Sequence, residues 1–288
     1  MHQKVMQMNK QPYIGITGYK TKKELTSTAQ DYARACDMEL GNKHRLMMGL
    51  LCSSKRLANP SIEGTQSPAF SELPYLLNHA RRLSFEMSQD PQERHCIPQQ
   101  AFLPMIHYHP EAKEKLEEEV SRVFDTAGIY KQGLCRAVQL NCAWPEPTQL
   151  EALKNKFPDL VMVIQLPRAA IETLQPRQLA ERAREYAAFA DYFLVDGSGG
   201  FGIEFQHEKS IEILHALGEE VPGASLGIAG GLGNHNVYDR VKKLRIQLGN
   251  EFNIDAQNKL RREREMEKLS TIDCCNYLEE AVRAFAGK

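Results

Sequence analysis

Short apolar runs recur along this chain, and stretches with helical spacing of apolar residues lie between them. The runs hold Val, Ile, Leu, Met and aromatic residues almost without interruption, which is typical of strands covered on both faces. The eight runs are Pro12–Thr17, Arg45–Cys52, Ala101–His107, Cys135–Leu140, Leu160–Leu166, Tyr192–Val195, Ala224–Ile228 and Phe252–Ile254. The helical stretches are Glu111–Ala127, Leu179–Phe189, Ser210–Leu217, Val237–Leu248 and Cys275–Phe285. Eight strand–helix units predict an α/β fold, a single (β/α)8 barrel with a parallel eight-stranded core.

The chain is somewhat longer than such a barrel needs. It has 288 residues, against ~250 in a typical (β/α)8 barrel. We expect a tail at residues 1–11, the barrel at 12–288 and an enlarged connection at about 53–90. A helix is expected in that connection near Phe70–Met87. The charged run Lys259–Lys268 is expected to be the solvated face of a helix.

Composition narrows the class of partner. The 36 basic and 37 acidic side chains give a net charge of −1, which argues against a strongly basic nucleic-acid binder. We find no apolar run of transmembrane length and no secretory signal, so no membrane partner is expected. Seven scattered cysteines without a CxxC pair do not form a disulfide framework. Reduced thiols and a cytoplasmic location are therefore expected.

Glycine-rich loops follow the sixth and seventh strands. A carboxylate, Asp196, ends the sixth strand and precedes the first loop. Burying a carboxylate costs free energy unless it has a partner or a functional role. Both loops hold more glycine than a tight turn requires, and their backbone N–H groups suit an anion. The predicted phosphate-binding residues are Gly199, Gly200, Gly202, Gly230, Gly231 and Lys259. The letters Gly197-x-Gly199-x-x-Gly202 match a dinucleotide fingerprint, but the next strand does not end in the acidic residue that this fingerprint needs.

Several of these segments, taken together, resemble phosphoribosylanthranilate isomerase. The resemblance rests on Asp196 with GSGGFGIEF, Gly230-Gly231-Leu232 and Val138-Gln139-Leu140. Weaker matches are Ile14–Thr17, Ser53–Arg56 and Asp255. It covers most of the chain in order and is strongest from about Tyr192 to Asp255. The family is a single barrel that carries out an Amadori rearrangement in tryptophan synthesis without a cofactor.

The resemblance implies a role for each matching residue. Asp196 would be the general acid, and Gly230 and Gly231 would bind phosphate. Arg56 would meet a carboxylate, as a bidentate guanidinium does well. The substrate-binding residues would be Arg56, Gln139 and Asp255. No cofactor is implied.

The chain departs from the family pattern at two places. The family's general base is a Cys on the first strand, where this chain has Ile14. The family's phosphate segment after the eighth strand is replaced by Ala256–Lys259, in which Lys259 could supply a point charge. An Amadori step needs both an acid and a base. The family's base therefore has to be replaced if this chain performs that step.

Two residues at the strand ends are candidates for the missing base. Cys142 follows the fourth strand, and His107 ends the third. His107 and His109 would face the same way along a strand and could form half of a metal site. No second half-site is evident, so no metal is expected. A packed thiol and hydrogen-bonded histidines are the alternative interpretation of these residues.

Three hypotheses follow from these observations. The first is an isomerase acting by acid–base chemistry on a phosphoribosyl-linked small molecule. The second is a related barrel that binds a phosphorylated metabolite with a different reaction or none, and Ile14 favours it over the first. The third is a partner-binding barrel with relic loops, which the joint presence of Asp196, Arg56 and Gly230 disfavours. The expected partner is a phosphorylated small molecule, with a homodimer left open.

Overall fold

Eight parallel strands close into one barrel in chain order, and β1 pairs with both β2 and β8. The computed structural model describes residues 11–39, 42–88, 101–198, 205–262 and 267–287. The strands are β1 (Tyr13–Thr17), β2 (Arg45–Ser53), β3 (Phe102–His109), β4 (Ala137–Leu140), β5 (Val161–Leu166), β6 (Tyr192–Asp196), β7 (Ser225–Ala229) and β8 (Asn253–Ala256). The predicted (β/α)8 barrel is confirmed, and every strand overlaps the apolar run that predicts it.

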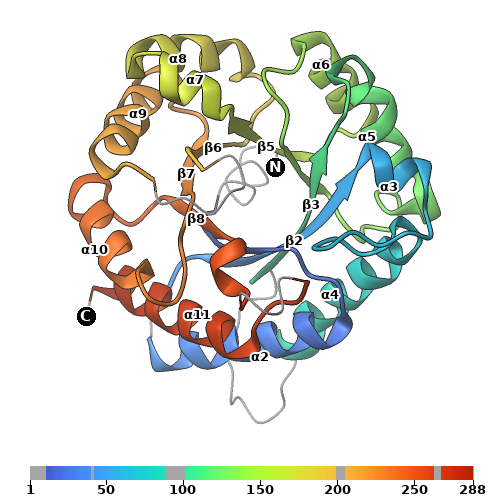
Figure 1. Ribbon diagram of the computed structural model, residues 1–288, viewed down its shortest axis with the longest axis horizontal. Helices are drawn as coiled ribbons and strands as arrows, with labels where there is room; N and C mark the ends of the chain where they lie inside the picture. The colour runs from blue at the N-terminus through green and yellow to red at the C-terminus, as the bar shows by residue number, and fades with distance from the viewer. Residues whose placement is uncertain (1–10, 40–41, 89–100, 199–204, 263–266, 288) are drawn as a thin grey trace.

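Helices surround the barrel as an outer ring (Figure 1). They are α2 (Lys22–Met38), α3 (Ser54–Ala58), α4 (Leu73–Ser88), α5 (Leu116–Asp125), α6 (Pro147–Lys156), α7 (Arg168–Thr173), α8 (Pro176–Ala183), α9 (His207–Glu220), α10 (Val237–Leu248) and α11 (Thr271–Ala286). Helix α11 packs beside α2, so the ring of helices closes as the strands do. Among the residues that the structure describes, no helix combines the length and apolar character needed to cross a bilayer.

Two of the expected elements outside the strands have different outcomes. The helix expected near Phe70–Met87 is present as the 3-10 turn η1 (Phe70–Glu72) followed by α4. The solvated helix expected at Lys259–Lys268 is wrong for the part that the structure describes. There the 3-10 turn η5 (Asn258–Leu260) ends after three residues, and Arg261 is only 6 % exposed. Its guanidinium donates to the Gly18 carbonyl at 2.7 Å, which draws the side chain inward.

The barrel interior is filled at its amino-terminal end. Tyr13, Met47 and Tyr192 belong to a cluster of buried side chains inside the barrel, separate from the larger core between strands and helices. The Tyr13 and Tyr192 rings lie 5.5 Å apart, and the Arg45 guanidinium donates to the Tyr192 hydroxyl at 2.8 Å. A close-packed interior leaves no channel through the barrel. Space for a ligand inside the strands therefore has to be sought at the carboxyl-terminal end.

Asn253 fastens the seam where the last strands meet the first. Its Oδ1 accepts from the Tyr13 backbone N–H at 2.9 Å, and its Nδ2 donates to the Leu226 carbonyl at 2.7 Å. Gly227, in register with Asn253, makes room for it, because a Cβ at position 227 would lie 2.8 Å from the Asn253 Cβ. One amide side chain thus ties β7, β8 and β1 together.

Candidate active site at the barrel mouth

A small cavity lies at the carboxyl-terminal ends of the strands and has a volume of 80 Å³. Active sites of (β/α)8 barrels lie at this end, so the cavity is the candidate site. Six predicted site residues line it: His107, Gln139, Asp196, Gly230, Gly231 and Asp255. Further lining residues include Gln165, Ser198 and Asn258. The fold thus brings together residues that lie far apart in the sequence.

Asp196, the last residue of β6, is held by several donors although it is only 8 % exposed. The Gln165 side-chain amide donates to its Oδ2 at 2.9 Å. The Ser198 backbone N–H and hydroxyl both donate to its Oδ1, at 2.9 and 2.6 Å. Three hydrogen bonds from neutral donors thus hold the Asp196 carboxyl group in one orientation.

Two glutamines extend this network across the barrel. Gln139 on β4 donates through its side-chain amide to the Gln165 side-chain oxygen at 3.2 Å, and Gln165 in turn donates to Asp196. The Gln139 Oε1 is buried and accepts no hydrogen bond from the part of the chain that the structure describes. Gln165 is not among the predicted site residues, although a polar side chain near the end of an apolar run is the same signal that indicates Asp196. An unsatisfied buried acceptor facing a cavity is suited to a ligand donor.

Asp255 on β8 is equally buried but has fewer side-chain donors. It is 7 % exposed, and the Thr17 hydroxyl lies 3.0 Å from its Oδ1 and 3.2 Å from its Oδ2. Burial, with a smaller effect from the charge of Asp196, raises the pKa of the Asp255 carboxyl to about 7, although the Thr17 hydrogen bond opposes this. Asp255 therefore exchanges a proton near neutral pH, as acid–base residues of enzymes do.

His107 completes the polar surface on the opposite side of Thr17. It is buried, and both ring nitrogens lie 3.4 Å from the Thr17 hydroxyl oxygen. Burial lowers the pKa of the His107 imidazole to about 3, so the ring is neutral at physiological pH. A neutral ring of such low basicity is a weak proton acceptor. This geometry favours His107 as a hydrogen-bonding wall of the cavity, and its predicted role as the base stays a prediction.

The turn after β7 has the shape that its glycines predict. Gly230 and Gly231 have φ of +108° and +65°, a left-handed backbone that favours glycine. Asn236 braces the turn, since its Oδ1 accepts from the Gly233 N–H and its Nδ2 donates to the Gly231 carbonyl, each at 3.0 Å. α10 begins directly after Asn236. The other predicted phosphate ligands, Gly199, Gly200 and Gly202, lie outside the described residues.

Three predicted site residues do not line the cavity. Arg56 donates to the Ile62 and Glu63 carbonyls at 3.0 and 2.9 Å, which directs its guanidinium to the loop after β2. Burial raises the pKa of the Cys142 thiol to about 11, so this thiol stays protonated near neutral pH. Lys259 is exposed. The roles predicted for these residues have no support in the cavity geometry.

Strand β1 presents the opposite face to the one that the family comparison assumes. Ile14 packs in the core between strands and helices, whereas Tyr13 belongs to the interior cluster. Thr17 lies on the same face of β1 as Tyr13, and its hydroxyl donates to Asp255 at the mouth. Gly15 shares that inward face, where a Cβ would lie 2.8 Å from the Asp255 Oδ1. A base at position 14 would therefore face the helices, and Thr17 is the polar inward side chain of this strand.

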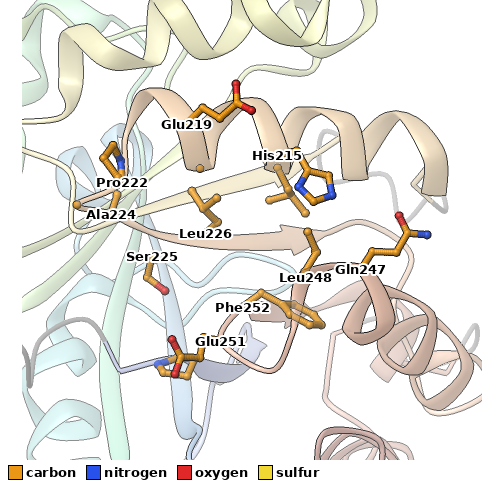
Figure 2. A pocket seen from close by; sticks show the side chains of 14 residues that line it. His215, Glu219, Pro222, Ala224, Ser225, Leu226, Gln247, Leu248, Glu251 and Phe252 are labelled. Carbon is orange, nitrogen blue, oxygen red and sulfur yellow. The ribbon is translucent and has the colours of Figure 1, made fainter.

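A larger hollow lies at the opposite end of the barrel. It has a volume of 590 Å³ and lies between α9 and α10, beside the amino-terminal ends of β7 and β8 (Figure 2). His215 and Glu219 from α9, and Leu248 from α10, border it. Its volume suits a small molecule better than that of the mouth. We nevertheless place the candidate site at the mouth, because that end carries the buried carboxyls and is the catalytic end of this fold.

Within the described residues, no three His, Cys, Asp or Glu side chains come together as they would to hold a metal ion.

Comparisons with known proteins establish the fold and no finer relationship. No protein-family model matches the chain, and no curated protein matches it. Among solved structures, it resembles the tryptophan synthase alpha subunit from Legionella pneumophila, with 11 % identity, a TM-score of 0.58, and coverage of 98 % of this chain and 97 % of that one. It also resembles the chitinase catalytic domain from Pyrococcus furiosus, with 11 % identity, a TM-score of 0.55 and coverage of 98 % and 99 %.

A third resemblance is partial in length. The chain is similar to ribulose-1,5-bisphosphate carboxylase/oxygenase from Pyrococcus horikoshii, with 13 % identity and a TM-score of 0.50. The match covers 90 % of this chain but only 55 % of that enzyme. At such identities these structures share a barrel fold with this chain. None of the three is a phosphoribosylanthranilate isomerase, so only the coarser part of the family comparison, a barrel of the type found in these enzymes, is confirmed.

Proposed function

We propose that this barrel is an enzyme that binds a phosphorylated small molecule at its mouth and transfers protons within it. The observation that carries the proposal is the pair of buried carboxyls, Asp196 and Asp255, which line one cavity in contrasting surroundings. Two carboxyls held in contrasting surroundings are a recurrent arrangement for acid–base chemistry. Isomerisation of a sugar phosphate is a reaction that such a pair can perform.

The turn after β7 supports a phosphorylated ligand. Gly230 and Gly231 line the cavity in a left-handed conformation, and α10 starts a few residues later. Backbone N–H groups in such a turn, near a helix N-terminus, bind anions without a charged side chain. The loops after strands seven and eight are also where barrels of this fold often bind phosphate. One matched barrel, the carboxylase, carries a bisphosphorylated sugar in its name.

The finer proposal, an Amadori rearrangement of a phosphoribosyl-linked amine, rests on the resemblance alone. The inward face of β1 offers Thr17 and no thiol, so the family's base is missing. Losing a positioned base costs roughly 10²–10⁴-fold in rate. We expect this protein to convert phosphoribosylanthranilate slowly or not at all. The change in anthranilate fluorescence measures this conversion. Turnover typical of a metabolic enzyme would show that another residue replaces the base.

Binding of ribose 5-phosphate, with ribose as the control ligand, tests the proposed site. Gly230→Asp places a negative side chain in the turn and should lower affinity for the phosphorylated sugar at least about tenfold. Gly249→Asp is the matched control, because Gly249 also has a positive φ of +75° but lies at the end of α10 with open space around it. Equal affinity in the parent and Gly230→Asp, or equal affinity for ribose, would contradict the proposal.

A further inference from the structure

We propose that Asp255 is the proton donor of this site and that Asp196 is the carboxylate that accepts the substrate's carbon-bound proton. This assignment rests on the proposed function and reverses the sequence-based expectation, which made Asp196 the acid. It names Asp255 as a catalytic residue, whereas the family resemblance made it a substrate-binding one. Thr17 becomes a positioning residue that acts through Asp255.

The strand register places the two carboxyls at one level of the barrel. Asp196 on β6 is level with Ala229 on β7, and Ala229 is level with Asp255 on β8. Adjacent strands lie ~4.8 Å apart, so the two backbones are roughly 10 Å apart. Inward side chains from alternate strands approach each other across the same layer. A small sugar carbon and its neighbouring oxygen can therefore lie between the carboxyl groups.

The hydrogen bonds of the two carboxyls differ in a way that separates their roles. Asp196 accepts three hydrogen bonds, from a backbone N–H, a hydroxyl and a side-chain amide. Among the residues that the structure describes, Thr17 is the side chain that donates to Asp255, and the backbone of the adjacent Ala256 contributes a smaller effect. When two buried carboxyls interact, the one with weaker support holds the proton. That carboxyl is Asp255.

The groups around Asp255 do not compensate its charge. Its titratable neighbours are the buried phenols of Tyr13, Tyr19 and Tyr277, the Asp196 carboxyl and, beyond Thr17, the neutral His107 ring. Tyr277 already donates to the Gly15 carbonyl at 3.3 Å. Among the described residues, neither Asp255 nor Asp196 has an ion-pair partner within 4.0 Å. Burial and the Asp196 charge thus oppose a charge on Asp255, and no described cation offsets them.

The two carboxyls together can isomerise an aldose phosphate to a ketose phosphate. The Asp196 carboxylate removes the proton from C2, the C–H electron pair becomes the C1–C2 double bond, and the carbonyl oxygen at C1 takes the proton of Asp255. The enediol then returns its C2 hydroxyl proton to Asp255 while Asp196 protonates C1. The product is the ketose, and both carboxyls regain their starting states. No oxidant, reductant or metal is consumed.

Titration of the aspartate side chains tests the assignment without any substrate. The 13C signals of the carboxyl carbons should include one that titrates near pH 7 in the parent protein. That signal should be absent from Asp255→Asn and should remain in Asp196→Asn with a lower midpoint, because a nearby negative charge is lost. Thr17→Val should raise the midpoint, since its hydroxyl lowers the pKa of Asp255, and Thr17→Ser should restore it.

A second set of measurements separates this inference from the proposed function. With ribose 5-phosphate as the substrate, kcat/KM should fall as pH rises above about 7 and the donor loses its proton. Asp255→Asn should lower kcat by roughly 10²–10⁴-fold. Thr17→Val should move the alkaline limb of the kcat/KM profile to higher pH, with little change in KM.

Different outcomes would overturn different statements. If the signal near pH 7 vanishes in Asp196→Asn and persists in Asp255→Asn, the roles are exchanged and the inference fails while the function stands. If every aspartate titrates below about pH 5, the inference fails as well. If Asp255 titrates as expected but a panel of sugar phosphates neither binds nor reacts, the proposed function fails, and the catalytic role of Asp255 fails with it.

Discussion

Replacing Asp255 by asparagine should make the stability of the barrel less sensitive to pH. The folded-state pKa of this carboxyl is about 7, whereas an unfolded aspartate titrates at about 3.9. Between these values the folded protein holds a proton that the unfolded chain has released. Stability contributed by this group is therefore fully present below the unfolded pKa and is lost as the pH rises through the folded pKa.

The magnitude follows from the two pKa values. Each pH unit in that interval costs about 1.4 kcal/mol of unfolding free energy, so the full interval of about 3 units costs about 4 kcal/mol. Between pH 5 and pH 8 the parent should lose about 3 kcal/mol that Asp255→Asn does not lose. Asparagine keeps the shape of the side chain and can still accept from the Thr17 hydroxyl.

Urea unfolding of the parent and of Asp255→Asn at pH 5, 6, 7 and 8 measures this difference. The control is Asp239→Asn, because Asp239 is an exposed aspartate on α10. Titrations shared by the three proteins cancel in the comparison, so only the difference between curves matters. A gap between parent and Asp255→Asn that stays constant within about 0.5 kcal/mol from pH 5 to 8 would refute the argument that burial raises this pKa.

Three further substitutions or probes test other parts of the structure. Gly227→Ala should destabilise the fold by about 1–3 kcal/mol in urea unfolding, because its Cβ would collide with Asn253. Gly218→Ala on α9 is the control and should not destabilise the fold, because the nearest atom to its Cβ would lie 3.9 Å away. Equal effects of the two substitutions would contradict the packing at the seam. The ring signals of His107 should not shift between pH 5 and 8 in NMR spectra, and a midpoint near 6.5 would contradict its burial. Cys142 should react with iodoacetamide at pH 7 no faster than an ordinary thiol, since a burial-raised pKa leaves little thiolate, and rapid alkylation would restore it as a candidate base.

The eight strands could be predicted because each is covered on both faces and therefore requires a nearly continuous run of apolar residues. The turn after β7 could also be predicted, because the left-handed backbone at Gly230 and Gly231 favours glycine. An uninterrupted apolar strand, however, does not reveal which of its residues face inward. The family resemblance places the base at position 14, whereas Ile14 packs toward the helices and Thr17 is the side chain that reaches the mouth.

The remaining differences come from contacts between distant segments. Arg261 lies in a charged run whose sequence predicts a solvated helix, but its guanidinium donates a hydrogen bond to the carbonyl of Gly18, which is distant in the sequence. Arg56 has the residue type for a ligand carboxylate, yet the loop that follows it offers two carbonyls nearer at hand. No local pattern contains either partner. The contrast between Asp196 and Asp255 is of the same kind, because it depends on donors from β5 and β1.

The seam between β8 and β1 has a consequence for how the barrel assembles. The Asn253–Tyr13 hydrogen bond joins residues 240 positions apart, so it forms only after all the strands between them have been synthesised. Until then β1 and the last strand present open edges, which are templates for pairing with another chain. Pairings this distant in sequence are slow to form. The final closure is therefore the step at which aggregation competes with folding, and substitutions at the seam should lower the yield of refolding more than they lower the stability of the folded protein.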